Sequence, residues 1–152
     1  MCAASRPLQY EVDIVATQKQ GKLVEGKVRS HTLLIDQPEL LSGTDKAPNP
    51  LETYAFSLGA CLVSAMRFVG GLEGLPISNI QARVQGTVYS EKAMEGEKTW
   101  RAGFPELAID VRFDAPWSEK EKRAFVERVV ARCPICDNTS NSTPLHIVVT
   151  NE

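Results

Sequence analysis

Residues 50–72 read PLETYAFSLGACLVSAMRFVGGL, and this stretch decides the fold. It lacks both the alternation of a strand and an interior proline, so we expect a helix over 51–72. Asn49 is the expected N-cap, Pro50 suits the first turn, and the turn GGLEGLP at 70–76 ends the helix. Apolar side chains lie on every face of this helix, and such a helix must be buried all round.

The burial of this helix has a consequence for assembly. A chain of 152 residues with one other long helix has little material with which to enclose it. We therefore predict a homodimer with a large apolar interface. The longest uncharged apolar run, residues 53–66, is too short to span a bilayer, so no membrane partner is expected.

The remaining elements follow from periodicity and turn residues. Ser118 and Glu121 have the spacing of a capping box, which predicts the start of a second helix. A polar stretch at 91–103 is the expected connection of a hairpin. The predicted order is β-β-β-α-β-β-α-β, an α+β fold in a single domain over 1–152, with strands within residues 8–17, 22–28, 31–36, 77–90, 104–113 and 144–150.

Composition restricts the class of protein. The chain is 43% hydrophobic and 24% charged with a net charge of -2, so a globular protein is expected and nucleic acid is not an expected partner. No charged segment followed by an apolar one begins the chain, so we expect a cytoplasmic protein. In such a reducing compartment, four cysteines are catalytic, metal-binding or simply buried.

Three of the cysteines lie in informative contexts, whereas Cys2 is not expected to take part in a site. Cys61 lies in the middle of the long helix, where a small buried residue is the ordinary interpretation. Cys133 ends the second helix and precedes Pro134, which would place its sulfur near free backbone N–H groups. That setting lowers a thiol pKa and favours the reactive thiolate. Cys136 follows three residues later.

Two other readings of the Cys133–Cys136 pair stay open. A zinc site needs four ligands, so His31, His146 and Cys61 would have to converge on the pair. A thioredoxin-type Cys-Pro-x-Cys pair needs its first cysteine at the start of a helix that follows a strand, whereas Cys133 follows the end of a helix.

Two stretches together resemble the OsmC/Ohr family, the osmotically induced and organic-hydroperoxide-resistance proteins. APNPLETYAFSLGACLVSAM, residues 47–66, is similar to the family's signature helix through Pro50, Glu52 and Cys61. ARCPICDNTSNSTPLHIVV, residues 131–149, resembles its second signature, a helix ending in Cys-Pro, a short polar turn and a closing strand. The element order matches as well, and the chain looks like a divergent OsmC-like member.

This resemblance implies an intertwined homodimer in which two long central helices are wrapped by antiparallel-rich β-sheets. It implies a thiol-dependent peroxidase that reduces organic hydroperoxides and acts in the oxidative stress response. By the resemblance, Cys61 is the peroxidatic thiol and becomes a sulfenic acid, and Cys133 resolves it as a disulfide. A dithiol such as dihydrolipoamide or a thioredoxin-like partner restores both thiols, with no cofactor and no metal.

The match departs from the family at three positions. Active members hold the thiolate with an arginine from an early glycine-rich strand, and here residues 17–31 offer Arg29 as an accessory cation. Glu52, the expected orienting carboxylate, lies about 180° round the helix from Cys61, so its role would run through the dimer partner. It is otherwise a helix N-terminal acid. Cys136 replaces a polar residue and is a possible second resolving thiol.

Two alternatives to the peroxidase follow. One is a non-catalytic OsmC-like relative that binds a small apolar ligand in the dimer cleft, which the missing strand arginine favours. The other is a metal or CxxC redox site made by Cys133 and Cys136. The cation that approaches Cys61 is also open among Arg29, Arg67, Arg83 and the lysines.

Overall fold

The structure is a computed structural model that describes residues 9–89 and 102–150. The chain divides into two compact units, one ending at Thr53 and the other beginning at Tyr54. The expectation of a single domain stays a prediction. Most of the hairpin connection expected at 91–103 lies outside the described residues.

The N-terminal unit is built on a three-stranded antiparallel sheet with the order β1-β2-β3. Its strands are β1 (Val15–Gln18), β2 (Val24–Val28) and β3 (His31–Ile35), followed by the short 3-10 helix η1 (Glu39–Leu41). β1 is shorter than the strand predicted over 8–17. Its pairing with β2 begins at Val15 opposite Lys27, and β2 offers few residues beyond that point.

Asp36 fixes the loop that follows β3. Its side chain is buried, and one carboxylate oxygen accepts hydrogen bonds from the Thr44 hydroxyl at 2.6 Å and from the N–H groups of Thr44 and Lys46, both at 3.1 Å. These hydrogen bonds, that of the Thr44 hydroxyl above all, lower the pKa of Asp36 to about 2. The loop is thus held in place by an ionised carboxylate.

The long helix α1 (Pro50–Leu72) has both of the ends that the sequence predicts. The Asn49 side chain accepts from the Glu52 N–H at 2.9 Å, and the Glu52 carboxylate accepts from the Asn49 N–H at 2.8 Å, a reciprocal capping box. At the other end Gly74 has φ +63, and the Leu75 N–H reaches back to the Gly70 carbonyl at 2.8 Å. This is a Schellman motif.

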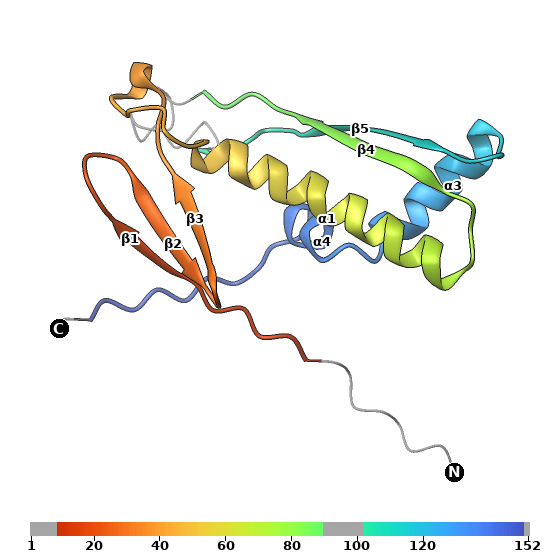
Figure 1. Cartoon of the computed structure of the whole chain (residues 1–152), viewed down its shortest axis with the longest axis horizontal. Coiled ribbons are helices and arrows are strands. Elements are labelled where there is room, and N and C mark those ends of the chain that lie inside the picture. The colour runs from red at the N-terminus through yellow and green to blue at the C-terminus, as the bar shows by residue number, and fades with distance from the viewer. Residues whose placement is uncertain (1–8, 90–101, 151–152) are drawn as a thin grey trace, which may run out of the picture. The chain divides into compact units, whose positions relative to one another are not determined.

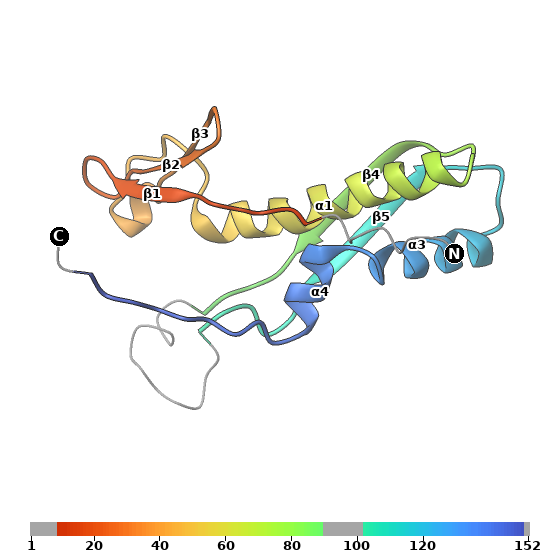
Figure 2. The same ribbon diagram turned by 90° about the horizontal axis from the view of Figure 1, so that it is seen from below.

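The C-terminal unit combines a two-stranded antiparallel sheet with helices (Figures 1 and 2). Strands β4 (Ser78–Gln85) and β5 (Ala108–Asp114) pair so that Ala82 lies opposite Val111 and Val84 opposite Ile109. Helix α3 (Glu119–Val130) begins with the predicted capping box of Ser118 and Glu121, and helix α4 (Pro134–Ser140) follows almost at once. The second helix is therefore confirmed, with a short third one behind it.

The core of this unit lies between the sheet and the helices. Gly59 of α1 lies so close to β4 that an added Cβ would be 3.2 Å from Val84, which places α1 on the face that Val84 shares with Ile109. Trp117 packs edge-on against Phe113 of β5 and Phe125 of α3, with ring centroids 6.2 and 5.4 Å away. The buried residues of the cluster are Leu58, Leu62, Met66, Val69, Ile77, Phe113, Phe125, Val129, Cys133 and Cys136.

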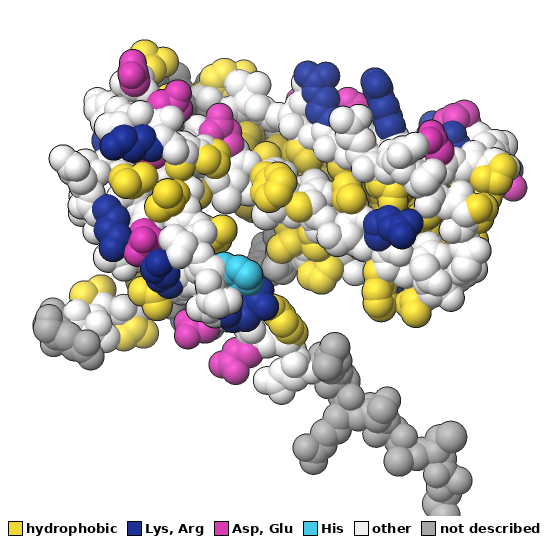
Figure 3. Space-filling view, in the orientation of Figure 1, with side chains coloured by type: hydrophobic (Ala, Val, Ile, Leu, Met, Phe, Trp, Pro, Cys, Tyr) yellow, Lys and Arg dark blue, Asp and Glu magenta, His cyan; other side chains and the backbone are white. Residues whose placement is uncertain are grey.

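Only part of α1 is buried within one chain. Leu58, Leu62, Met66 and Val69 face the core, whereas Phe56, Phe68 and Leu72 are 74%, 68% and 71% exposed. Figure 3 shows hydrophobic side chains gathered over the region where α1 runs. The 23-residue helix also has the length and mean hydropathy, 1.5, of a membrane span, but its buried face makes it the core helix of this unit. The complete burial that we expected is not reached by the single chain.

The strand predicted over 144–150 is absent, and this prediction is wrong for the single chain. Residues 142–150 have no regular structure and pair with no strand in the part of the chain that the structure describes. Leu145, Ile147, Val148 and Val149 are all more than 80% exposed. The apolar sequence is typical of a strand, but a strand forms only beside another that accepts its hydrogen bonds.

Candidate functional site

The candidate site is the place where the middle of α1 meets the start of α4. Cys61 is half-buried and packs against the core cluster through the same side of α1 as Leu58 and Leu62. Cys61 lies more than two helical turns beyond the capping box, so its position is set by the regular packing of α1 against the core. Cys61 is therefore held on a rigid element and still has access to small molecules.

Cys133 lies at the junction of α3 and α4. The last turn of α3 closes with the Cys133 N–H on the Val130 carbonyl at 3.1 Å, and Cys133 then takes extended dihedrals, φ -90 and ψ 112, as the N-cap of α4. Pro134 occupies the first helical position, where the missing N–H costs nothing. The Cys133 side chain is 1% exposed and points into the core.

Cys61 and Cys133 are 72 positions apart in the chain but meet at one buried cluster: Cys133 is a member of it, and Cys61 packs against it. Cys133 is near enough to raise the pKa of the Cys61 thiol, and the backbone of Ile135 lowers that pKa. A hydrogen bond of 2.9 Å between the Tyr54 and Thr139 hydroxyls joins α1 to α4 further along. Both cysteines are free thiols in this structure.

The electrostatic setting of Cys61 favours its neutral form. Burial raises the pKa of the Cys61 thiol, the Ile135 N–H opposes this effect, and the neighbouring Cys133 raises the pKa further. Among the described residues, no lysine or arginine contributes to the shift. Of the predicted cations, Arg67 donates a hydrogen bond to the Ile77 carbonyl at 3.2 Å. Arg83 is exposed, because its neighbours Ala82 and Val84 take the face of β4 that packs against α1.

The other predicted site residues are accounted for by local structure. Arg29 occupies the tight turn between β2 and β3 with φ +52, a left-handed backbone conformation. The Glu52 carboxylate belongs to the capping box of α1, which agrees with its interpretation as a helix N-terminal acid. Both residues belong to the N-terminal unit, whereas Cys61 belongs to the C-terminal unit.

Cys136 is the third thiol of this region. It is the third residue of α4, is 6% exposed, and belongs to the same core cluster as Cys133. In the described ranges, 9–89 and 102–150, no three His, Cys, Asp or Glu side chains are grouped so that they could hold a metal ion. The arrangement of the three cysteines is thus one of thiols alone.

α4 begins directly at Pro134, a helix that the sequence did not predict. Cys133 is therefore at the start of a helix, but this helix follows α3 and not a strand, so the objection to a thioredoxin-type pair stands. Proline at the first helical position was the available signal. The Ile135 N–H was also missed, since backbone groups leave no mark on the sequence.

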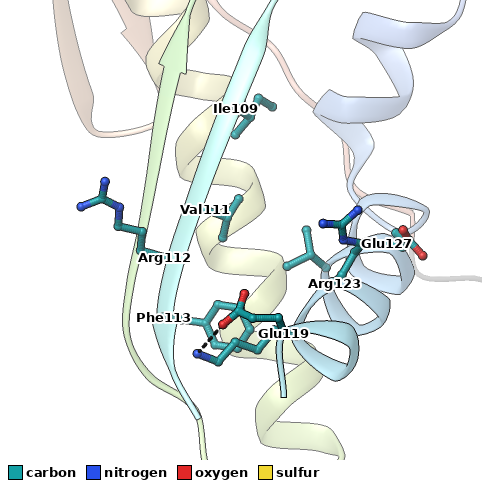
Figure 4. Close-up of a pocket in the computed structure, with 9 residues that line it drawn as sticks. Ile109, Val111, Arg112, Phe113, Glu119, Arg123 and Glu127 are labelled. Atoms are coloured by element: carbon teal, nitrogen blue, oxygen red, sulfur yellow. Dashed lines mark ion pairs between the residues drawn. The ribbon is translucent and has the colours of Figure 1, made fainter. Parts of the chain in front are cut away.

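A cleft of about 490 Å³ lies elsewhere in the C-terminal unit, between β5 and α3 (Figure 4). Ile109, Val111 and Phe113 form its apolar wall, and Glu119 with its ion-pair partner Lys122, 3.7 Å away, lies at one end. No cysteine lines this cleft. It is therefore separate from the thiol site.

Comparison with known proteins identifies the family. The family described as OsmC-like protein matches residues 43–148, which include both signature stretches up to Val148. No curated protein matches the sequence.

Three solved structures give the same fold. An OsmC-like protein from Mycoplasma pneumoniae has a TM-score of 0.76 at 18% identity, with 89% of this chain and 91% of that one covered. An organic hydroperoxide resistance protein OsmC from Legionella pneumophila has a TM-score of 0.62 at 22% identity, covering 86% and 90%. An organic hydroperoxide resistance protein from Elizabethkingia anophelis, with thiocyanate bound, has a TM-score of 0.61 at 20% identity, covering 90% and 93%. With the paired thiols, the two signatures and the α+β architecture in agreement, the chain belongs to the OsmC-like protein family.

Proposed function

We propose that this protein is a thiol-dependent peroxidase that reduces organic hydroperoxides, with Cys61 as the attacking thiol and Cys133 as the resolving thiol. The observation that carries the proposal is that Cys61 packs against the buried cluster that contains Cys133, where α1 meets α4. Family membership supports it, as do the structural neighbours named organic hydroperoxide resistance proteins.

The reaction proceeds in three balanced steps. The Cys61 thiolate attacks one oxygen of the hydroperoxide, the O–O bond breaks, and an alcohol leaves after it takes up a proton. Cys61 becomes a sulfenic acid, and the Cys133 thiolate displaces its oxygen as water to form a disulfide. A dithiol then reduces the disulfide by two thiol exchanges and is itself oxidised. We propose dihydrolipoamide or a thioredoxin-like protein as this dithiol.

The surroundings of Cys61 suit an organic substrate. The buried cluster against which it packs includes Leu58, Leu62 and Val129, and such apolar walls favour an alkyl chain over hydrogen peroxide. The half-exposed position of Cys61, in contrast to the 1% exposure of Cys133, leaves Cys61 as the thiol that a hydroperoxide can reach first. The order of the two roles follows from this difference in access.

The raised pKa of Cys61 requires a positive group to stabilise its thiolate. Arg29 stays our proposal for that cation, and Lys27 on the same hairpin provides a matched control. If Arg29 has this role, Arg29→Ala reduces the rate of hydroperoxide consumption at least tenfold, whereas Lys27→Ala leaves it nearly unchanged. Equal rates in the two variants would remove Arg29 from the mechanism.

Glu52 can be tested separately as the orienting carboxylate. Glutamine also serves in a capping box, so Glu52→Gln removes the charge and keeps the cap, whereas Glu52→Ala removes both. A carboxylate that acts in catalysis predicts a large loss of rate in both variants. Full activity in Glu52→Gln would leave Glu52 with the capping role alone.

The central experiment is addition of cumene hydroperoxide to the reduced protein, followed by a count of free thiols. The wild type loses thiols and forms a Cys61–Cys133 disulfide, Cys133→Ser accumulates a sulfenic acid on Cys61, and Cys61→Ser is inert. Retention of every thiol in the wild type, or equal loss in Cys61→Ser, contradicts the proposal.

The assembly and location of the protein are part of the proposal. Exposed apolar side chains on α1 and over 145–149 support a homodimer in which a second copy covers them. We propose the cytoplasm as its location, since a thiol reduced by a dithiol partner suits a reducing compartment.

One observation favours a second candidate function. Because no described cation lowers the pKa of Cys61, a relative that binds a small apolar ligand in the dimer cleft, without turnover, also fits. It predicts a ligand-dependent rise in melting temperature and no peroxide consumption with any dithiol. Steady turnover would dispose of it.

A further inference from the structure

We propose that Cys136 completes a three-thiol relay, in which the disulfide between Cys61 and Cys133 passes to the Cys133–Cys136 pair. The inference rests on the proposed peroxidase function, which supplies the first disulfide. It assigns a role to the one thiol of the site that the peroxidase mechanism leaves unused.

The first support is that Cys133 is common to two pairs. It lies in the buried cluster against which Cys61 packs, and as the N-cap of α4 it precedes Cys136 by three residues. The Asp137 N–H closes that turn on the Cys133 carbonyl at 3.0 Å. Side chains three apart in a helical turn are neighbours, and this Cys-x-x-Cys spacing is compatible with a disulfide.

The second support is that the three residues share one environment. Cys133 and Cys136 are both members of one apolar cluster, and the partly buried Cys61 packs against it. The Cys133 side chain also makes no capping hydrogen bond to α4, so no such bond has to break when its sulfur changes partners. The Cys133 side chain is therefore free of a helix-capping role that would compete with the exchange.

The step is a thiol–disulfide exchange that balances without any added reactant. The Cys136 thiolate attacks the Cys133 sulfur, the Cys61–Cys133 bond breaks, and Cys61 leaves as a thiolate that takes up the proton lost by Cys136. The Cys133–Cys136 disulfide holds the oxidising equivalent. Cys61 is then reduced again and can attack a second hydroperoxide before any reductant arrives.

The relay predicts a stoichiometry that one resolving thiol cannot give. Without reductant, the wild type consumes two equivalents of cumene hydroperoxide per chain. The first equivalent ends as the Cys133–Cys136 disulfide and the second as a Cys61 sulfenic acid, which dimedone traps. Cys136→Ser consumes one equivalent and stops at the Cys61–Cys133 disulfide. A Cys2→Ser background keeps the fourth cysteine out of the count.

The test combines this stoichiometry with a time course of disulfides. Reduced protein receives one equivalent of cumene hydroperoxide, is quenched with acid at intervals, and is alkylated and mapped by mass spectrometry. The expected result is a Cys61–Cys133 disulfide that rises and then decays into Cys133–Cys136, with Cys61 alkylated at the end. A stable Cys61–Cys133 disulfide with Cys136 still alkylated overturns the relay. Should Cys136→Ser fold poorly, Cys136→Ala and the wild-type time course give the same decision.

A second arm separates failure of the relay from failure of the peroxidase. Cys61→Ser is equilibrated in a dithiothreitol redox buffer, which needs no peroxide. A Cys133–Cys136 disulfide there supports the pair, and its absence overturns the relay while the peroxidase proposal stands. No thiol loss with hydroperoxide in the wild type overturns the peroxidase, whatever the redox buffer shows.

Discussion

At the scale of single residues, the site depends on one thiol that is reachable and one that is not. Cys61 is partly exposed to solvent, and the backbone of Ile135 lowers the pKa of its thiol. Cys133, in contrast, is fully buried. Burial still dominates the ionisation of Cys61, since the donated hydrogen bond only opposes part of the rise in its pKa. The reactivity of Cys61 should therefore depend strongly on pH.

The first prediction concerns alkylation of Cys61. Because the folded chain favours the neutral thiol, the rate of reaction with iodoacetamide should still rise with pH beyond the range in which an ordinary free thiol levels off. Cys133→Ser should shift this profile to lower pH, since Cys133 adds to the rise. Rates measured by mass spectrometry at a series of pH values check both points. A plateau below pH 7 would show that a cation already stabilises the thiolate.

The second prediction concerns Asp36. Its folded pKa of about 2 lies below the ordinary value of 3.8, so its contribution to stability is present above the ordinary value and is lost as the pH falls towards 2. Thr44→Val removes the strongest of its hydrogen bonds and should raise the pKa of Asp36. Acid unfolding followed by circular dichroism should then begin at higher pH in Thr44→Val. An unchanged acid limb in this variant would contradict the assignment.

At the scale of elements, α1 and α3 were predictable because each carries its own local signals. Two helix starts are set by capping boxes whose side chains are only three residues apart, Asn49 with Glu52 and Ser118 with Glu121. The end of α1 is set by one glycine, Gly74. α4 was harder, since Pro134 follows another helix directly.

Strand ends were less predictable than helix ends because they depend on a partner strand. β1 begins only where its pairing with β2 begins, at Val15 opposite Lys27. Residues 144–150 have no partner strand among the described residues. The contact of Cys61 with Cys133 came from the family resemblance and from no local pattern. No sequence rule reaches across the 74 positions from Cys61 to the backbone of Ile135.

The third prediction tests the packing of α1 through two adjacent glycines. A Cβ on Gly70 would lie 2.3 Å from the Ile77 side chain, whereas a Cβ on Gly71 would meet nothing within 4 Å. Gly70→Ala should destabilise the protein by about 1–3 kcal/mol through overpacking. Gly71→Ala should be neutral or stabilise it by up to about 1 kcal/mol, because alanine favours helix. Urea unfolding of both variants gives the comparison, and equal effects would contradict the close contact at Gly70.

At the scale of the whole molecule, a single chain leaves much apolar surface uncovered. The exposed side chains of α1 and the extended segment over 145–149 lie on parts of the same C-terminal unit. Monomeric soluble proteins rarely expose large contiguous apolar patches. This is the physical reason why a homodimer was predicted from the helix alone.

The fourth prediction is the oligomeric state. Sedimentation equilibrium should give twice the mass of the chain, and Phe56→Asp should weaken the dimer at least tenfold, because Phe56 is 74% exposed within one chain. Lys120→Asp, at another exposed helical position, serves as the control and should keep the dimer. A wild type that sediments as a monomer at micromolar concentration would contradict the prediction.

The aromatic cluster beside α3 has a practical consequence. Trp117 lies edge-on to two phenylalanine rings and so has a rigid, apolar environment that disappears when the C-terminal unit melts. In a Trp100→Phe background, Trp117 is the sole indole of the chain. Its emission maximum therefore offers an intrinsic optical probe, without any attached dye, for measuring whether the packing of this unit changes when the thiols are oxidised.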